Sequence, residues 1–516
     1  MRGLALSAVL VLALASWWAF RPQTTDAPGP EAAKTAAPKI LRVGVLTLPP
    51  EKGYPYNSTG IPTIYTYRAI FDGLTYVTEA GDVQPFLATS WEQIDPLTWR
   101  FKLREGVTFS NGAPFTADAV AFAVNYVARP GGEVDSITRE LIGLKSAEVE
   151  SPTSVLIHTK RVEPLLPAAL EQLLIVEPET FKALGKEGFA AAPVGTGPFQ
   201  VVTWEPAKAD LVAFKQSWRA PKVDKLEIIA LPDTSSRVQA IESGQIDIGV
   251  ALGYENQVAL EQAGARAHVS KTTSTLALTF IFTEMPPGHP LQNKAVRQAL
   301  NYAVNKEAYI QALFGGVTEP ATQPTTVSGF GYNPDLKPYP YDPERAKKML
   351  AEAGFAKGFS FTAKITNGGG AALAEVYQQV AADFARVGVT MQLEVITIPQ
   401  LIRLAAEGNW KSEAFGMNFS AERTLDALRP VRIHSCLKPN PWFCDKALTA
   451  KIEQAYATGD LEARRKLTQE IMAAWHDDAP VVWLHDVVMF EGLSKRVRNY
   501  RVDNTVIRYD LIDVAD

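Results

Sequence analysis

The stretch "PVGTGPFQVVTWEP", residues 193–206, lies near the middle of the 516-residue chain and decides how the chain is divided. Gly195 and Gly197 are followed by Pro198 and then by a strand-like run, residues 199–204. A phosphate-binding loop needs a lysine and a hydroxyl residue entering a helix, and a dinucleotide-binding turn needs a third glycine before a helix. The stretch has neither feature. Because glycine tolerates positive φ and proline fixes the exit, the pattern predicts a sharp bend where the chain crosses between two folded units.

From residue 40 onward, strand-like and helix-like patterns alternate along the chain. Apolar runs typical of buried strands occur at residues 41–48, 199–204, 225–231, 275–282, 361–365, 391–396 and 481–485. Helical periodicity or helix-end signals occur at residues 115–127, 289–304, 341–355, 373–387, 446–456 and 461–475. The alternation predicts an α/β fold. The chain length predicts two or three domains.

Two of these helices carry clear end signals. In the first, Thr116 is the expected N-cap, and Asp118 lies in the first turn near the positive end of the helix dipole. In the third, Asp342 is the expected N-cap, Pro343 opens the helix and Gly354 follows its end.

Charge and motif content exclude several classes of function. With 51 Lys and Arg against 56 Asp and Glu, the net charge is −5, which argues against a nucleic-acid partner. None of the six histidines belongs to an H-E-x-x-H motif, and the S-x-x-K match at residues 435–438 lacks its K-T-G and S-D-N companions. We interpret the acids of "WHDDAP", residues 475–480, as a solvated helix end. The sequence therefore predicts no catalytic residues, no metal site and no cofactor.

The N-terminus indicates export. One positive charge, Arg2, precedes an apolar run from Gly3 to Phe20, as in a secretory signal peptide. Cleavage is favoured, and an uncleaved membrane anchor is the alternative, because the run approaches the length that spans a bilayer. Residues 21–39, rich in Ala, Pro and Thr, are expected to be a flexible linker. In an exported chain, the two cysteines, Cys436 and Cys444, are expected to form a disulfide rather than remain reduced.

Several stretches, taken in order, resemble one family: the extracellular solute-binding proteins of peptide, dipeptide and nickel ABC transporters, family 5. They include "VQPFLATSWEQIDPLTWRFKLREGVTFSNGAPFTADAVAFAVNYV", the GTGP segment, "SSRVQAIESGQIDIG", "NKAVRQALNYAVNKEAYIQALFGGVTEPATQP" and "YDPERAKKMLAEAGF". The likeness extends from about residue 40 to about residue 502. It implies a type II periplasmic-binding-protein clamshell of two lobes, with an extra subdomain inserted in the first lobe. The expected segments are lobe I at 40–75, 190–278 and 486–516, the inserted subdomain at 76–189, and lobe II at 279–485.

The resemblance implies a periplasmic, monomeric carrier that captures a peptide or peptide-like solute between its lobes. The solute would pass to an ABC permease in the inner membrane. In relatives that bind peptides, an aspartate in a stretch like A-D-Y-x-D-P holds the ligand's ammonium group. The matching stretch in this chain, residues 415–430, lacks the tyrosine and the Asp-Pro pair. Nickel is disfavoured as cargo, because His434 is the only imidazole nearby.

Acids and bases in that stretch are the first candidates for ligand contacts. Glu422 and Asp426 are the nearby acids, and Asp426 is the expected anchor, although a surface helix cap explains it nearly as well. We expect Asp426→Ala to weaken binding and to leave the melting temperature nearly unchanged. Arg423 is an alternative partner for a ligand carboxylate or phosphate.

Other candidates follow from topology, because ligands of open α/β sheets lie beyond the carboxyl ends of the strands. These candidates are Tyr54, Tyr56 and Asn57 after the first strand, Asn418 and Ser420 within residues 415–430, and Trp442 within the cysteine loop. For the first three, a packed loop is an equal alternative. For the whole chain, the alternatives are a carrier of a non-peptide solute, such as an opine, sugar conjugate or organic acid, and a membrane-anchored sensor or enzyme.

Overall fold

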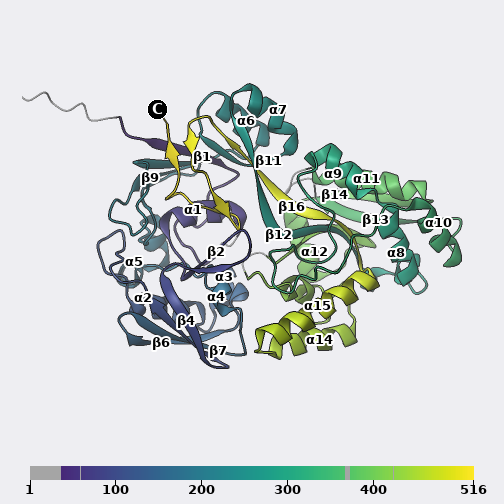
Figure 1. Cartoon of the computed structure of the whole chain (residues 1–516), viewed down its shortest axis with the longest axis horizontal. Coiled ribbons are helices and arrows are strands. Elements are labelled where there is room, and N and C mark those ends of the chain that lie inside the picture. The colour runs from purple at the N-terminus through teal and green to yellow at the C-terminus, as the bar shows by residue number, and fades with distance from the viewer. Residues whose placement is uncertain (1–36, 58–59, 367–371, 422–423, 516) are drawn as a thin grey trace, which may run out of the picture. The chain divides into compact units, whose positions relative to one another are not determined.

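The computed structural model describes residues 37–57, 60–366, 372–421 and 424–515 (Figure 1). Residues from Lys39 onward form one compact unit, which holds every helix and strand of the described residues. The helices are α1 (Ile61–Ile70), α2 (Ala117–Val127), α3 (Ser136–Glu140), α4 (Leu166–Ala169), α5 (Pro178–Ala191), α6 (Thr234–Glu242), α7 (Gln257–Gln262), α8 (Lys294–Ala303), α9 (Lys306–Phe314), α10 (Pro343–Glu352), α11 (Leu373–Arg386), α12 (Ile398–Glu407), α13 (Leu428–Ile433), α14 (Lys446–Ala457) and α15 (Leu461–Asp478). The strands are β1 (Ile40–Val45), β2 (Thr75–Val77), β3 (Val83–Pro85), β4 (Ala88–Asp95), β5 (Thr98–Leu103), β6 (Leu144–Ser151), β7 (Ser154–Thr159), β8 (Phe199–Trp204), β9 (Lys208–Ala213), β10 (Lys225–Ala230), β11 (Ile248–Leu252), β12 (Arg266–Phe280), β13 (Phe359–Thr366), β14 (Val389–Ile396), β15 (Ala414–Ser420), β16 (Val481–Leu493), β17 (Val497–Arg498), β18 (Val502–Asp503), β19 (Val506–Ile507) and β20 (Asp513–Val514).

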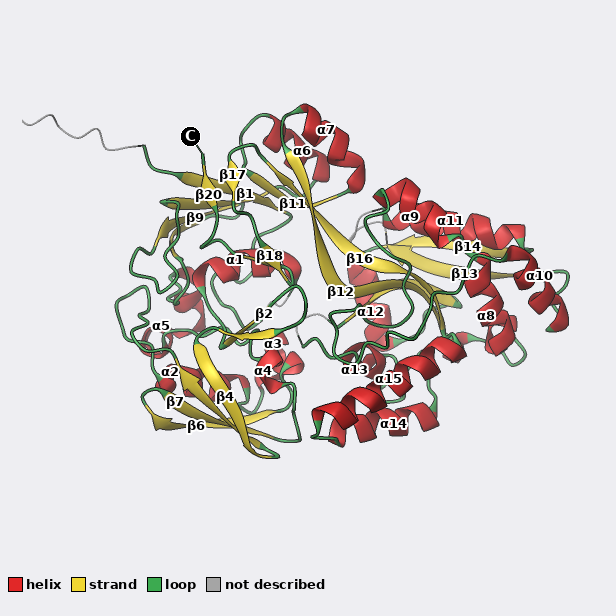
Figure 2. Cartoon of the chain, viewed as in Figure 1, coloured by secondary structure: helices red, strands yellow, loops and turns green. Residues whose placement is uncertain are grey.

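Ten strands form one continuous sheet in the order β14-β13-β15-β12-β16-β11-β1-β10-β9-β8 (Figure 2). β1 pairs in parallel with β10 and β11, and β13 pairs in parallel with β14 and β15. β12 is antiparallel to both of its neighbours. Each strand and helix range predicted from the sequence overlaps an element of the predicted kind, so the predicted α/β class is confirmed.

Two long strands, β12 and β16, join the two halves of this sheet. The first part of β12 pairs with the end of β16, from Arg266 opposite Leu493 to Lys271 opposite Val488. Its last part pairs with the start of β16 and with β15. Between Lys271 and Thr275 the register shifts, so the regular ladder is interrupted midway between the halves. Such irregularities bend a strand locally.

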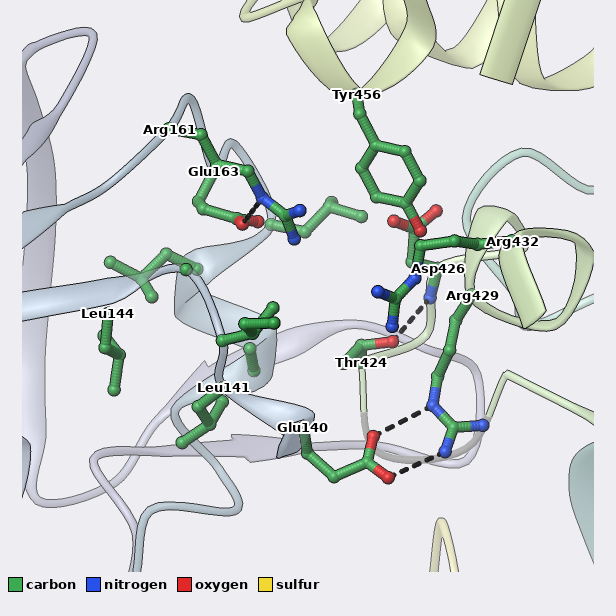
Figure 3. A pocket seen from close by; sticks show the side chains of 15 residues that line it. Glu140, Leu141, Leu144, Arg161, Glu163, Thr424, Asp426, Arg429, Arg432 and Tyr456 are labelled. Atoms are coloured by element: carbon green, nitrogen blue, oxygen red, sulfur yellow. Dashed lines mark hydrogen bonds and ion pairs between the residues drawn. The ribbon is translucent and has the colours of Figure 1, made fainter. Parts of the chain in front are cut away.

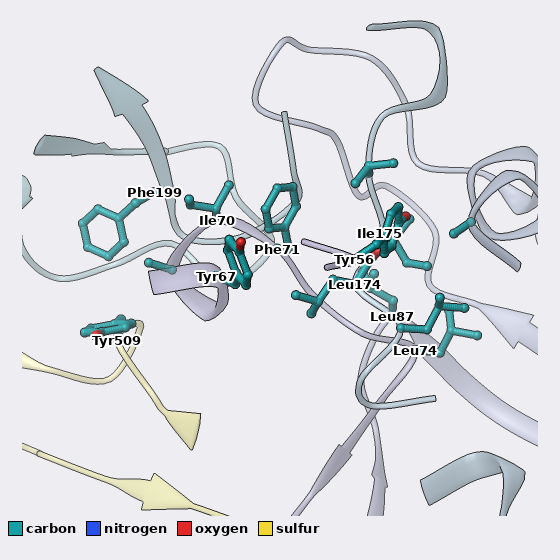
Figure 4. Close-up of a cluster of buried hydrophobic side chains, with 14 of the residues drawn as sticks. Tyr56, Tyr67, Ile70, Phe71, Leu74, Leu87, Leu174, Ile175, Phe199 and Tyr509 are labelled. Atoms are coloured by element: carbon teal, nitrogen blue, oxygen red, sulfur yellow. The ribbon is translucent and has the colours of Figure 1, made fainter. Parts of the chain in front are cut away.

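Buried apolar side chains form several clusters around the sheet. One cluster takes side chains from β1, β8, β9, β10 and the segments that pack on them (Figure 4). A second gathers around β12 to β16 and the helices α8 to α11, and it also includes side chains of α6, β11 and α7. A third lies around β15, β16 and the helices α13 to α15. The apolar core is therefore continuous across β11, β12 and β16, while the first and third clusters are separate from each other.

A second sheet, β4-β5-β7-β6, lies between α1 and the GTGP segment in the sequence. α2 packs on β6 and β7 and begins after Thr116, the predicted N-cap, although the Thr116 hydroxyl donates to the Asp118 side chain (3.0 Å) and not to the helix backbone. In α10 the predicted cap is complete: the Asp342 carboxylate accepts from the Arg345 backbone N–H (2.9 Å).

The GTGP segment is a structural bend, as predicted, but for a different reason. Neither glycine adopts a positive φ. The segment instead lies against the end of α1, where the Gly197 N–H donates to the Ile70 carbonyl (2.9 Å). A Cβ on Gly195 would lie 2.1 Å from that same carbonyl oxygen. Close approach of two backbones therefore requires glycine at this position.

The acids of the "WHDDAP" stretch end α15, but they are not simply solvated. Asp478 pairs with Arg297 of α8 (3.0 Å), and Asp477 pairs with Lys294 of the same helix. These ion pairs hold the end of α15 against α8, which the sequence pattern did not indicate.

Candidate functional site

A pocket lies between two walls that are far apart in the sequence, one from residues 140–169 and one from residues 424–456 (Figure 3). Its lining residues are Glu140, Leu141, Ile142, Gly143, Leu144, Arg161, Glu163, Leu165, Leu166, Ala169, Thr424, Asp426, Arg429, Arg432 and Tyr456. The cavity volume is about 60 Å³. Pockets for drug-sized ligands measure roughly 300–1,000 Å³. A solute larger than a few water molecules therefore fits only if the walls move apart.

The first wall begins with α3, and the loop after β1 holds α3 in place. The Ile137 N–H donates to the Tyr56 carbonyl (3.1 Å), and the Tyr54 hydroxyl donates to the Asp135 carboxylate (2.9 Å). The Tyr54 and Tyr56 side chains are fully buried, and burial raises the pKa of both hydroxyls, which stay protonated as donors. In this conformation the two predicted ligand contacts support the wall that carries Glu140.

The rest of the first wall holds an ion pair of its own. The Arg161 Nε lies 2.5 Å from the Glu163 carboxylate. Gly143 makes room for this pair, because a Cβ there would lie 2.3 Å from the Glu163 oxygen. The Arg161 guanidinium also lies 5.1 Å from the centre of the Tyr456 ring, which belongs to the opposite wall. A cation over a ring contributes roughly 0.5–1 kcal/mol where it is exposed.

The second wall is built on α13, which places Arg429 and Arg432 three residues apart and so on one helix face. Arg429 donates to the Ser420 carbonyl at the end of β15 (2.8 Å). It also crosses the pocket to Glu140, with Nε–Oε2 and Nη2–Oε1 distances of 3.0 and 2.8 Å. This two-point ion pair is the strongest polar link between the walls.

Asp426 lines the pocket but is already engaged. One carboxylate oxygen accepts from the Leu428 N–H at the start of α13 (3.0 Å). The other lies 2.6 Å from Nη2 of Arg464, and both side chains are buried, at 8% and 1% exposed. Asp426 therefore fixes α13 against α15 from a buried position, whereas the alternative for this residue was a helix cap on the surface.

Of the arginines that line the pocket, Arg432 is the one without an ion pair among the described residues. Glu163 pairs with Arg161, Glu140 with Arg429, and Asp426 with Arg464. Within the described part of the chain, no carboxylate lies within 4.0 Å of the Arg432 guanidinium. Arg432 is half-buried and near Tyr456, whose hydroxyl pKa is raised by burial.

The other predicted residues lie apart from this pocket or outside the described residues. Asn57 donates to Glu51 in the loop after β1, and Asn418 lies on β15 opposite Leu276. Glu422 and Arg423 lie outside the described residues. Their roles as ligand contacts, like those of the tyrosines, Ser420 and Asp426, stay predictions.

The cysteine loop contributes to the core of the second wall. Cys436 and Cys444 form the predicted disulfide. Trp442, predicted as an apolar wall for ligand, is 2% exposed and donates its indole N–H to Nδ1 of His434 (2.7 Å). His434 also stacks on Phe419, and burial holds the pKa of its imidazole well below the usual value. In this conformation both rings pack in the core and do not line the pocket.

Sequence reasoning missed the pocket's main charged residues, Glu140, Arg161, Glu163, Arg429 and Arg432. Only the spacing of the last two offered a signal, since two arginines three residues apart just beyond a strand face the same way on a short helix. In the described ranges, no group of three or more His, Cys, Asp or Glu side chains is arranged to hold a metal ion. A search of the same residues finds no helix of a length and apolarity that would span a bilayer.

Comparison with known proteins relates the chain to one family. The model of bacterial extracellular solute-binding proteins, family 5 Middle, matches residues 82–426. Heme-binding protein A of Haemophilus influenzae is 28% identical over 454 residues, covering 81% of this chain and 82% of that protein. The dipeptide-binding protein of Escherichia coli is 27% identical over 491 residues, covering 87% and 88%.

Solved structures share the fold. CtaP, an ABC transporter substrate-binding protein from Listeria monocytogenes, matches with a TM-score of 0.82 at 21% identity, covering 92% of this chain and 99% of its own. The periplasmic binding protein DppA from Helicobacter pylori, in complex with the peptide STSA, matches with a TM-score of 0.74 at 22% identity, covering 92% and 98%. The predicted two-lobe clamshell is therefore confirmed as the fold.

Proposed function

The chain belongs to the bacterial extracellular solute-binding proteins of family 5, and we propose that it is the periplasmic solute-capturing component of an ABC importer. Its cargo is a peptide or peptide-like solute, taken up between two lobes and delivered to a permease in the inner membrane. The observation that carries this proposal is the pocket itself. Its two walls belong to different cores and are linked by polar contacts that water can replace.

The lobes correspond to the two halves of the sheet. We assign residues 40–75, 190–278 and 486–516 to lobe I, 76–189 to its inserted subdomain, and 279–485 to lobe II. The crossings lie on β12 and β16, where the register shift between Lys271 and Thr275 interrupts the ladder. A hinge needs only a few residues that absorb a change of backbone angles.

Closure follows from contacts made only when the lobes meet. Glu140 of the inserted subdomain and Arg429 of lobe II form the two-point pair across the pocket. A solute that touches both walls adds free energy to the closed form alone, and so shifts the population toward it. Binding of a solute to the wall residues should therefore close the two lobes of the protein.

Export completes the proposal. Residues 1–20 act as a signal peptide or an anchor and residues 21–39 as a linker, so that the carrier works as a monomer outside the inner membrane. Sequencing the N-terminus of the protein from isolated envelopes tests this part. A chain that begins near Ser16 indicates cleavage, and an intact Met1 on purified membranes indicates anchoring.

Peptide capture is tested by calorimetry together with small-angle scattering. Pools of di- to pentapeptides are titrated into the purified protein, and each pool that releases heat is added before scattering is measured. We expect heat with at least one pool and a smaller radius of gyration in its presence. Failure of every pool to give heat would remove peptides as cargo.

A non-peptide solute is the second candidate, and one observation favours it. The aspartate expected to hold a peptide's ammonium group, Asp426, is already paired with Arg464. An opine, sugar conjugate or organic acid does not need that anchor. Parallel titrations with opines and sugar phosphates separate the two candidates, because only one class of solute is expected to give heat.

A further inference from the structure

We propose that the pocket receives an anionic group of the solute, a carboxylate or a phosphate, and that Arg432 is the residue that binds it. This inference rests on the proposed function and specifies the chemistry of its cargo. It starts from the pairing of charges around the pocket, in which three carboxylates and three arginines neutralise one another.

Arg432 remains as a cation with no acidic partner in the described part of the chain. It is half-buried, and it sits beside the ring of Tyr456 with Arg161 and Arg464 also near that ring. A partly desolvated guanidinium gains most from a partner that accepts two parallel hydrogen bonds, which carboxylates and phosphates do. An anion brought by the solute would complete the pairing.

The geometry keeps Arg432 available for this role. Its neighbour on the same face of α13, Arg429, is held by Glu140 and by the Ser420 carbonyl. Asp426, the acid that could otherwise reach Arg432, is held by Arg464 and the Leu428 N–H. In Figure 3 the Arg432 side chain extends from α13 toward the opposite wall, between Tyr456 and Arg429.

Beyond the charged residues, much of the first wall is apolar, and this indicates the chemistry of the rest of the solute. Leucine and alanine residues of the first wall line the pocket: Leu141, Leu144, Leu165, Leu166 and Ala169. A solute with an anionic end and an apolar body fits these walls once they part. A dipeptide with a free carboxylate and an apolar last residue has this chemistry, and so does a phosphorylated conjugate with an apolar portion.

The test compares acids with neutral partners of the same shape. Ala-Leu and its C-terminal amide, and glucose 6-phosphate and glucose, are titrated by calorimetry into the wild-type protein and into Arg432→Gln. Arg403→Gln is the matched control, because it removes the same charge from an exposed arginine of α12 outside the pocket. The peptide and sugar arms distinguish a carboxylate from a phosphate.

We expect the wild-type protein to bind one acid at least tenfold more tightly than its neutral partner. Arg432→Gln should lose about ten- to a hundredfold in affinity for that acid, the range for a charged hydrogen bond, with no change for the neutral partner. Arg432→Lys should recover part of the loss, since the charge remains without the fork. Unchanged acid preference in Arg432→Gln would overturn the proposal.

If the wild-type protein binds none of the four probes, the solute released by heat from protein purified out of its native envelope decides the matter. Mass spectrometry that finds a carboxylate or phosphate in this solute supports the proposal, and a neutral or cationic solute overturns it. The absence of any solute, bound or released, would count against the carrier function itself and would remove this inference with it.

Discussion

Two ion pairs at the pocket look alike in chemistry and differ in what they connect. Asp426 and Arg464 join α13 to α15 within one wall, with their side chains 8% and 1% exposed. Glu140 and Arg429 join the two walls, with their side chains 19% and 23% exposed. Both pairs put an aspartate or glutamate against a guanidinium at 2.6 to 2.8 Å.

The difference in burial decides the role of each pair. Separating a buried pair leaves a charge in a poorly solvated place, which is costly, so Asp426 and Arg464 stay together as the protein opens and closes. Water can reach the partners of a pair that is about one-fifth exposed, so Glu140 and Arg429 can separate at lower cost than the buried pair. The pocket is thus rigid within each wall and adjustable between the walls.

The largest expected effect comes from breaking the buried pair. Asp426→Ala should lower the free energy of unfolding by about 3–5 kcal/mol, because Arg464 is left buried without its partner. Urea denaturation followed by circular dichroism measures this loss. The structure therefore reverses the expectation from the sequence that the melting temperature would hardly change.

Adding Arg464→Met to Asp426→Ala provides the control for this prediction. The double variant no longer buries an unpaired charge, so it should recover part of the lost stability. Equal stability of Asp426→Ala and the wild-type protein would show that the pair does not hold α13 in place.

Glu491 is a third carboxylate for this comparison, and it is buried beside a hydroxyl donor, with no ion pair among the described residues. Glu491 on β16 is 1% exposed and accepts a hydrogen bond from the Ser270 hydroxyl (2.9 Å), and burial raises its pKa to about 8. The folded state therefore binds this proton more tightly than the unfolded state. The stability that this proton contributes is fully present below about pH 4.5 and is lost as the pH rises through 8, at about 1.4 kcal/mol for each unit of pH between the two values.

Glu491→Gln should remove that loss, since the amide does not ionise. Urea denaturation at pH 5, 7 and 9 should show the variant gaining on the wild-type protein as the pH rises. The exposed Glu453→Gln is the control, and it should run parallel to the wild-type protein. Parallel curves for Glu491→Gln would mean that Glu491 keeps its charge in the fold.

The smallest effect on stability is expected from the pair between the walls. Glu140→Gln should change the free energy of unfolding by about 1 kcal/mol, less than the loss in Asp426→Ala, because water reaches this pair and the glutamine amide can still accept from Arg429. It should nevertheless enlarge the radius of gyration of the solute-free protein, since the closed form loses its main polar link. Small-angle scattering measures this shift.

Glu462→Gln is the matched control for Glu140→Gln. It breaks an exposed pair with Arg465 within α15 and should leave the radius of gyration unchanged. If Glu140→Gln and Glu462→Gln scatter alike, the pair between the walls does not favour closure.

The sequence by itself determined the class of fold and the positions of its elements. Those features depend on local patterns, such as apolar runs for strands, the start of α2 after Thr116 and the cap at Asp342, which neighbours in the sequence create. It also predicted the disulfide, because Cys436 and Cys444 are close in the chain. The GTGP bend was predicted with the wrong cause, since the backbone that approaches Gly195 comes from residue 70.

The tertiary structure alone decided which charged groups form the pocket. Glu140 and Arg429 lie 289 positions apart, and Asp426 finds its partner 38 positions away, so no local pattern announces either pair. The partner of a charged side chain depends on the distance between the two groups and on their burial. Both quantities depend on how distant segments of the chain pack together. For the same reason the sequence suggested Asp426 as the ligand's anchor, while the folded chain pairs Asp426 with Arg464 and leaves Arg432 without a carboxylate partner in its described residues.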